Sequence, residues 1–209
     1  MEAAIDRVLR RQNSSGGFAL WSNSGTELNW LTVYVTDFVT AARDAGALVP
    51  HDALTKSLDR LQRYLSGTTN IHYAWSDNED YYRFATKAYA AYVLARSNRA
   101  PLAHLRRLFE AQENSSARSG LPWAHLGFAL KVAGDTELAQ QAFDKAKQTK
   151  YSQGYYGYYG SELRDAALLY AVLAKSGQAE GQQLLDVFDL ARQRRWLSTQ
   201  ERNSLFQAA

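Results

Sequence analysis

Two kinds of helical pattern alternate along this chain, and the alternation limits the folds that it can adopt. The segments of the first kind are apolar on nearly every side, which is typical of helices buried on two faces; they begin near Leu28, Asp80, Leu121, Ser161 and Ser198. The segments between them carry one apolar stripe and a charged outer face. Successive apolar segments begin about 40 residues apart, so a pair of helices is the repeating unit. Buried inner helices inside amphipathic outer helices predict an all-α fold of the α/α toroid type.

Apolar residues spaced three and four apart predict about ten helices. Their expected ranges are 2–13, 28–45, 51–66, 80–97, 101–113, 121–133, 135–149, 161–176, 180–195 and 198–209. These form one helix pair fewer than a closed toroid usually has, and the chain stops inside the last inner helix. We therefore expect residues 1–209 to form a single, incomplete domain that is a fragment of a larger protein. Inner helices near Trp30 and Ser198 would then expose apolar faces, which self-associate or are shielded by the chain ends.

Residues that start and stop helices agree with these ranges. Each proline stands where a helix would begin, as a residue without an N–H group can; they are Pro50, Pro101 and Pro122. Each of three glycines follows a predicted helix end, as a left-handed cap does; they are Gly46, Gly134 and Gly177. Ser161 and Ser198 are expected N-caps, whereas Ser161-x-x-Arg164 and Thr199-x-x-Arg202 do not form capping boxes.

The segment 151–160 is rich in tyrosine and glycine and has no helical spacing. This composition suits a long ordered loop or a short hairpin. Aromatic side chains with polar tips are favoured where one end is dry and the other wet. The tyrosines Tyr155, Tyr156, Tyr158 and Tyr159 are therefore candidates for contact with a neighbouring domain, or they close the end of the barrel.

Composition excludes several classes of site. The 209 residues include no cysteine, so disulfides, thiolate metal sites and cysteine nucleophiles are absent. A formal net charge of +3 is too small to argue for nucleic acid. Because no apolar run approaches the roughly 18 residues of a spanning helix, we expect no membrane insertion. The four histidines have no metal-ligand spacing, so no metal or cofactor is expected.

Five sequence segments, taken in order, resemble the thioester domain of bacterial alpha-2-macroglobulin-like proteins, which are relatives of the complement components. The segments are Gln12–Trp21, Trp30–Phe38, Ala42–Gly46 with Val49-Pro50, Tyr159–Leu168, and Trp196–Glu201. The resemblance implies an α/α toroid within a much larger periplasmic protease inhibitor that serves in bacterial defence. Cleavage of a bait region in such a trap triggers covalent capture of the protease by a Cys–Gln thioester. The implied partners are the neighbouring domains of the parent chain and, through it, target proteases.

The Cys-x-Glu-Gln motif of that family is missing here, and Thr199-Gln200-Glu201 is not that motif. Either the sequence begins after the motif or the parent belongs to a subgroup without a thioester. No catalytic residue carries over, and the resemblance does not predict an enzyme. In complement relatives a loop histidine assists thioester transfer, and His72, in the loop before the predicted helix 80–97, is the loosely matching candidate.

Two alternatives stay open. Acidic residues near the starts of the inner helices could meet at one mouth of a toroid and hydrolyse glycosides as carboxylate pairs; they are Glu27, Asp77, Glu79, Asp80, Glu162, Asp165 and Glu201. The same acids can instead satisfy free N–H groups and the helix dipole. Arg164 and Asp165 are expected to reach different partners. A helical-repeat interaction scaffold is the second alternative, because residues 123–146 match one tetratricopeptide unit, although no copy follows at a 34-residue step.

Overall fold

The computed structural model describes residues 2–72, 78–113, 117–153 and 159–209. The described residues form ten helices and, apart from one isolated antiparallel bridge between Gln12 and Phe18, no β-structure. The helices are α1 (Glu2–Leu9), α2 (Asn29–Asp44), α3 (His51–Ser66), α4 (Glu79–Arg96), α5 (Leu102–Gln112), α6 (Leu121–Val132), α7 (Thr136–Gln148), α8 (Glu162–Lys175), α9 (Gly181–Arg192) and α10 (Thr199–Ala208). The prediction of an all-α fold is confirmed. No helix among the described residues is both long and apolar enough to cross a membrane.

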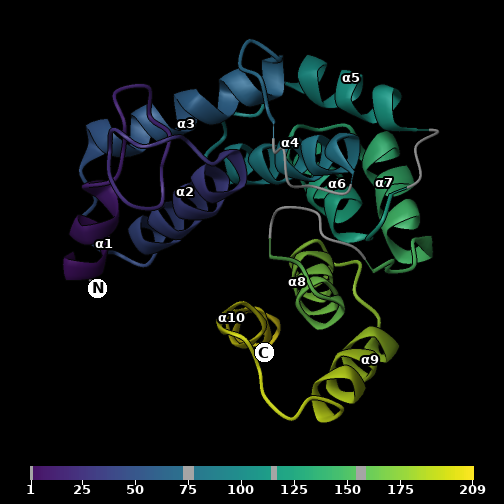
Figure 1. Ribbon diagram of the computed structural model, residues 1–209. Coiled ribbons are helices and arrows are strands. Elements are labelled where there is room, and N and C mark those ends of the chain that lie inside the picture. The colour runs from purple at the N-terminus through teal and green to yellow at the C-terminus, as the bar shows by residue number, and fades with distance from the viewer. Residues whose placement is uncertain (1, 73–77, 114–116, 154–158) are drawn as a thin grey trace.

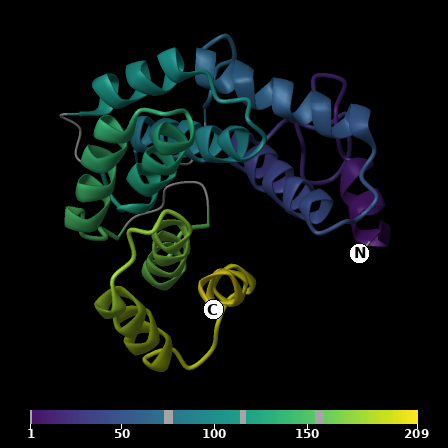
Figure 2. The ribbon, with the colours of Figure 1, turned by 180° about the vertical axis from the view of Figure 1, so that it is seen from behind.

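The helices follow one another around an open arc (Figures 1 and 2). Helices α2, α4, α6 and α8 form the inner layer, and α3, α5, α7 and α9 cover them from outside. The arc is open between its two ends, with α1 and α2 on one side of the gap and α9 and α10 on the other. This arrangement is the predicted incomplete toroid, because the helix pairs continue in one sense without closing the ring.

Close packing of inner helices explains why α4 and α6 are apolar nearly all round. Small side chains such as Ala88 and Ala91 are fully buried in α4, and α4 packs on α2, α3, α5 and α6. At Gly127 in α6 an added Cβ would lie 2.8 Å from the Phe143 ring of α7. The segment that matches a single tetratricopeptide unit is therefore one tightly packed helix hairpin within the larger arc.

The predicted helix boundaries hold to within a few residues, except at the end of the first helix. Helix α1 stops at Leu9 rather than near residue 13, because the chain turns around Asn13, whose Oδ1 accepts hydrogen bonds from the backbone N–H groups of Ser15 and Gly17. Ser198 is the N-cap of α10, as predicted, and it also forms a capping box with Glu201. The box was not predicted, because the motif was considered from Thr199 rather than from Ser198.

The other helix signals behave as predicted. The three expected caps have positive φ angles, 86° at Gly46, 91° at Gly134 and 66° at Gly177. Pro50 and Pro101 are N-caps, and Pro122 lies in the first turn of α6. Ser161 caps α8 by accepting a hydrogen bond from the Arg164 N–H group.

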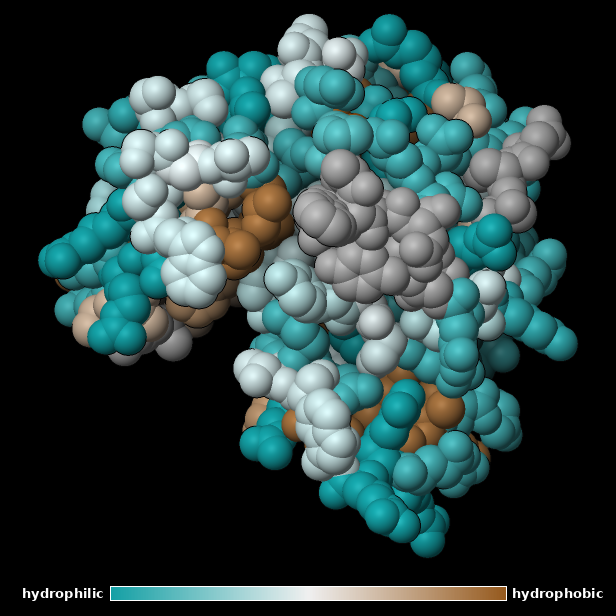
Figure 3. Space-filling model, viewed as in Figure 1, coloured by the Kyte–Doolittle hydropathy of each residue, from teal (hydrophilic) through white to brown (hydrophobic). Residues whose placement is uncertain are grey.

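Helix α10 is less buried than an inner helix was expected to be. Only Glu201 and Ser204 are buried in it, and Phe206 is 83% exposed. Helix α10 packs on α8, and a hydrogen bond from Asn203 Nδ2 to Tyr34 Oη, 3.3 Å long, reaches across to α2. Trp30 itself is only 5% exposed, whereas Phe38 further along α2 is 38% exposed. Figure 3 shows hydrophobic surface on the arm of the arc that contains α1 and α2. The expectation of an unpartnered apolar face on this helix stays a prediction.

Candidate functional site

The starts of the inner helices converge at one mouth of the arc. The Trp30 N–H group at the start of α2 donates to Tyr82 Oη of α4 at 3.2 Å. The Trp30 ring lies 5.8 Å from that of Tyr159, which precedes α8, and under the guanidinium of Arg164. A water-sized cavity of about 20 Å³ is lined by Trp30, Arg164 and Leu121 of α6. This mouth is therefore the place where loops from distant parts of the sequence meet.

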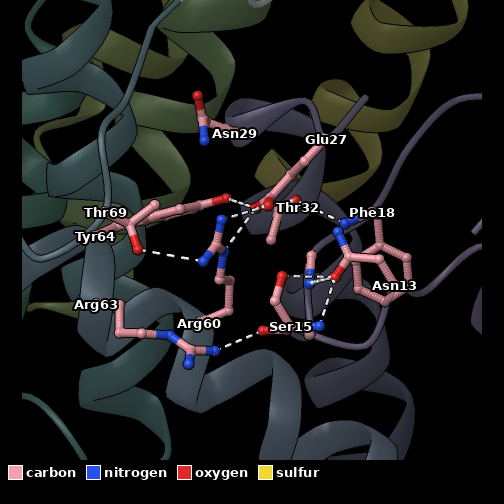
Figure 4. A network of polar contacts seen from close by, with 12 residues as sticks. Asn13, Ser15, Phe18, Glu27, Asn29, Thr32, Arg60, Arg63, Tyr64 and Thr69 are labelled. Carbon is pink, nitrogen blue, oxygen red and sulfur yellow. Dashed lines mark hydrogen bonds and ion pairs between the residues drawn. The ribbon is translucent and has the colours of Figure 1, made fainter. Parts of the chain in front are cut away.

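A network around Glu27 ties the loop before α2 to α3 (Figure 4). The Glu27 carboxylate accepts hydrogen bonds from Arg60 Nε at 3.0 Å and Nη2 at 2.5 Å, and also from the Tyr64 hydroxyl. Burial and the Glu27 charge raise the pKa of Tyr64. Burial opposes the charge on Arg60, but the hydrogen bond and charge of Glu27 outweigh it and raise the Arg60 pKa. An added Cβ at Gly17 would overlap the Glu27 carboxyl group, so the loop is held in one position.

His72 lies at this mouth between the starts of α2 and α4. The backbone N–H group of His72 donates to Asn29 Oδ1 at 3.2 Å, and the imidazole Nδ1 lies 2.5 Å from Glu79 Oε1. The hydrogen bond to His72 lowers the pKa of Glu79. The imidazole is exposed and oriented by a carboxylate, as a base acting on an incoming group would need to be. Its assisting role in thioester transfer stays a prediction.

Tyr159 is the one tyrosine of the predicted contact loop that lies within the described residues; Tyr155, Tyr156 and Tyr158 lie outside them. Tyr159 is 57% exposed and has a φ of 55°. A left-handed backbone is uncommon for a bulky residue and is found where the surroundings impose it. Contact with the buried Trp30 ring below it holds Tyr159 at the surface of the mouth.

A groove of about 750 Å³ extends the mouth between the starts of α8 and α10. Trp196, which is 74% exposed, lines it together with Arg194 and Arg195. Its floor is fixed by Glu201, which accepts hydrogen bonds from Ser161 Oγ and the Ser198 N–H group, both at 2.9 Å. Burial opposes the charge of Glu201, yet these hydrogen bonds lower its pKa. The groove was not predicted from the sequence, although the run Arg194-Arg195-Trp196 before the last helix was a signal for it.

A buried polar network fills the interior behind the mouth. Arg164 Nη1 donates to Asp165 Oδ1 at 2.8 Å, and the Arg164 guanidinium also lies over the Trp30 ring. The expectation that the two neighbours reach different partners stays a prediction. Further along the inner helices, Asp37 accepts hydrogen bonds from Tyr89 Oη at 2.7 Å and Arg96 Nη1 at 2.5 Å. Burial raises the pKa of Asp37 more than Arg96 lowers it. These groups hold the inner helices together.

Most of the acids proposed for glycoside hydrolysis that the structure describes form ion pairs or helix caps. Glu27 and Asp165 form ion pairs with arginines, and Glu201 caps α10. Glu79 and Asp80 both pair with Arg83; Glu162 is exposed, and Asp77 lies outside the described residues. The described part of the chain also holds no cluster of acids and histidines suited to a metal ion. The carbohydrate-active alternative is therefore not favoured.

Comparison with known proteins gives close relatives. No family model matches the chain. Alpha-2-macroglobulin of Escherichia coli strain K12 is 40% identical over 215 residues, which is 100% of this chain and 13% of that protein. Alpha-2-macroglobulin of Xylella fastidiosa strain Temecula1 is 36% identical over 99% of this chain and 13% of its own length. The chain thus spans a small part of these relatives.

Solved structures of alpha-2-macroglobulins superpose on this chain over almost its whole length. Native E. coli alpha-2-macroglobulin, determined by cryo-electron microscopy, matches with a TM-score of 0.92 and 41% identity, over 99% of this chain and 13% of that one. The trypsin-activated E. coli protein matches with a TM-score of 0.90 and 42% identity, over 98% and 14%. Salmonella alpha-2-macroglobulin reacted with methylamine gives 0.90 and 40%, over 97% and 13%. The same helical arc is present in native, protease-activated and amine-reacted relatives.

Proposed function

Because the chain is a member of the bacterial alpha-2-macroglobulin family, homologous over its length to one segment of those proteins, we propose that it acts as the thioester-type toroid domain of a larger protease trap. The observation that carries this proposal is the match to the native and trypsin-activated E. coli structures over nearly the whole chain. The solved structures include E. coli relatives activated by trypsin or by porcine elastase and a Salmonella relative reacted with methylamine. In this role the chain is a binding and positioning domain rather than an enzyme, and the parent protein works in the periplasm in bacterial defence.

The arc keeps its shape while the trap changes state, and its mouth makes the contacts that change. TM-scores of 0.92 and 0.90 to the native and activated E. coli proteins support a rigid domain. The mouth presents Tyr159, Trp196 and Arg195, the residue types that dominate protein–protein interfaces. A neighbouring domain of the parent therefore docks there. The tyrosines at 155, 156 and 158 belong to the same proposed contact.

These residues include no cysteine, so a thioester of the parent protein would have to lie outside them. His72, exposed at the mouth and hydrogen-bonded to Glu79, is the side chain in this chain best placed to assist transfer. A scaffold of tetratricopeptide type is not favoured, because the helix pairs repeat about every 40 residues and curve into an arc.

The test uses the longer protein that contains this chain. Replacing Trp196 with alanine in the groove should weaken the docked state, so that the trap reacts with methylamine before any protease is added. Replacing the equally exposed Leu48, which follows the end of an inner helix at the opposite side of the arc, is the matched control. Intact mass and trypsin capture on denaturing gels are measured for both variants.

Three outcomes separate the claims. Premature amine reaction in the Trp196 variant alone supports a docking mouth. Equal behaviour of both variants and the unmodified protein would remove the docking claim and leave the trap itself standing. Failure of the unmodified protein to capture or shield any protease would contradict the proposed function.

A further inference from the structure

A second groove, lined by basic side chains, lies where the outer helices α3 and α5 pass over the inner helix α4. Its volume is about 210 Å³. Arg83 and Lys87 of α4 line one wall, His104 and Arg107 of α5 line another, and Ser66 at the end of α3 contributes a hydroxyl group. No acidic side chain is among the lining residues within the described parts of the chain. The groove therefore concentrates positive charge without an internal counter-charge.

The partners of these groups leave the positive charge largely uncompensated. Arg83 reaches the exposed Asp80 at 2.9 Å and Glu79 at 3.5 Å, both outside the lining. Arg107 contacts the His104 imidazole and the Ala103 carbonyl oxygen. No ion pair to Lys87 or Arg107 occurs among the described residues. An ordinary solvated surface would intersperse the two signs of charge.

The position of Lys87 is costly for a lysine. It stands on an inner helix whose neighbouring positions, Thr86 and Ala88, are fully buried. Burial and the Arg83 charge lower the pKa of Lys87, and burial with the Arg107 charge lowers that of His104. An anion placed between the half-buried Lys87 and the neighbouring arginines would relieve the repulsion between their charges.

We propose that this groove binds a small tetrahedral oxyanion of the phosphate or sulfate class, held by Lys87 and Arg107 with Arg83 at its edge. Arginine forks and lysine ammonium groups are the usual protein partners of phosphate. A space of 210 Å³ lies below the roughly 300–1,000 Å³ of pockets for drug-sized ligands. It suits one oxyanion with a few waters and excludes a nucleotide. This inference does not depend on the docking role of the mouth.

The test is an NMR titration of the histidine rings with sodium phosphate at constant ionic strength, balanced with sodium chloride. Saturable shifts of the His104 signals, with a rise of the His104 pKa, are expected because a bound anion stabilises the charged imidazole. His51 and His72 serve as internal reporters and should stay unchanged. Saturating phosphate should also raise Tm by about 3 °C relative to chloride, since a ligand that binds only the folded state stabilises it.

Variants connect the response to the groove. Lys87→Met keeps the aliphatic stem, and Arg107→Gln changes an exposed position, so at least one is expected to fold. Each should weaken phosphate binding at least tenfold. Arg106→Gln removes the same charge one residue away, outside the lining, and should bind as the unmodified chain does.

Further ligands decide the class of anion. Glycerol 3-phosphate in place of phosphate distinguishes a phosphomonoester from the free ion, and tighter binding of either supports the site. Acetate binding as tight as phosphate, no saturable His104 shift below about 50 mM phosphate, or equal binding by the Arg107 and Arg106 variants would each overturn the proposal.

Discussion

His125 should make the folded domain sensitive to mild acid. The imidazole is 6% exposed in α6, stacked on the Tyr89 ring at 4.8 Å and close to the Tyr92 ring at 5.0 Å. Burial, together with the charges of Arg164 and Lys175, lowers its pKa from 6.5 to about 3. A proton added there would create a buried cation facing two others.

The sign of the effect follows from proton binding. Between pH 6.5 and 3 the unfolded chain holds a proton on residue 125 and the folded chain does not, so unfolding is favoured as pH falls. The slope is about 1.4 kcal/mol per pH unit. From pH 7 to pH 4.5 this gives a loss of about 2.5 kcal/mol, a large part of the 5–15 kcal/mol that usually stabilises a domain.

Asp37 acts in the opposite direction, because burial raises its pKa and the folded state then binds a proton more readily. The measurement must therefore compare variants. Urea unfolding followed by circular dichroism at pH 7.0 and 4.5 gives the loss of stability for the unmodified chain, His125→Phe and the exposed control His51→Gln. The Phe variant keeps an aromatic ring between the tyrosines and should lose about 2.5 kcal/mol less than the other two.

His125→Gln checks the result with a side chain that does not overfill the small cavity beside it. An equal loss of stability on acidification in the unmodified chain and in both position-125 variants would refute the reasoning. It would mean that the imidazole gains a proton in the folded state as easily as in the unfolded one.

Three further predictions concern the loops and the open edge. Glu27→Gln should lower the free energy of unfolding by about 2–3 kcal/mol in urea titrations, because the partly buried guanidinium and Tyr64 lose their anionic acceptor. Gly16→Ala should cost at least about 2 kcal/mol more than Gly46→Ala, since both have φ near 90° but only at Gly16 would the new Cβ overlap a backbone carbonyl; equal losses would contradict this. Phe206→Asp, in an apolar groove of about 590 Å³ between α9 and α10, should shift sedimentation toward the monomer, whereas an unmodified chain that is already monomeric at high concentration would rule out self-association there.

Most of the helices and their ends could be predicted from local signals in the sequence. Spacing of apolar residues separates the inner helices from the outer ones because it reports how many sides of a helix are buried. Gly46, Gly134 and Pro122 mark helix ends through backbone geometry that needs no tertiary partner. The mouth as a candidate site follows too, since helices of one layer begin at the same end.

The tertiary structure decided which polar groups meet. Glu27 pairs with Arg60, 33 residues away, and Asp37 pairs with Arg96, 59 residues away. Neither pair has a local signature, because the curvature of the arc sets which turns of distant helices face each other. The basic groove beside Lys87 could not be predicted for the same reason, because its walls come from different helices.

Helix α10 shows the limit of periodicity most clearly. Its sequence pattern predicted an inner helix, and its cap at Ser198 formed as a local motif must. Burial, however, depends on what packs on both sides. Helix α10 lies beside α8 at the open edge of the arc, and Phe206 stays exposed. A residue pattern states what a helix could bury, whereas only the arrangement of its neighbours determines what it does bury.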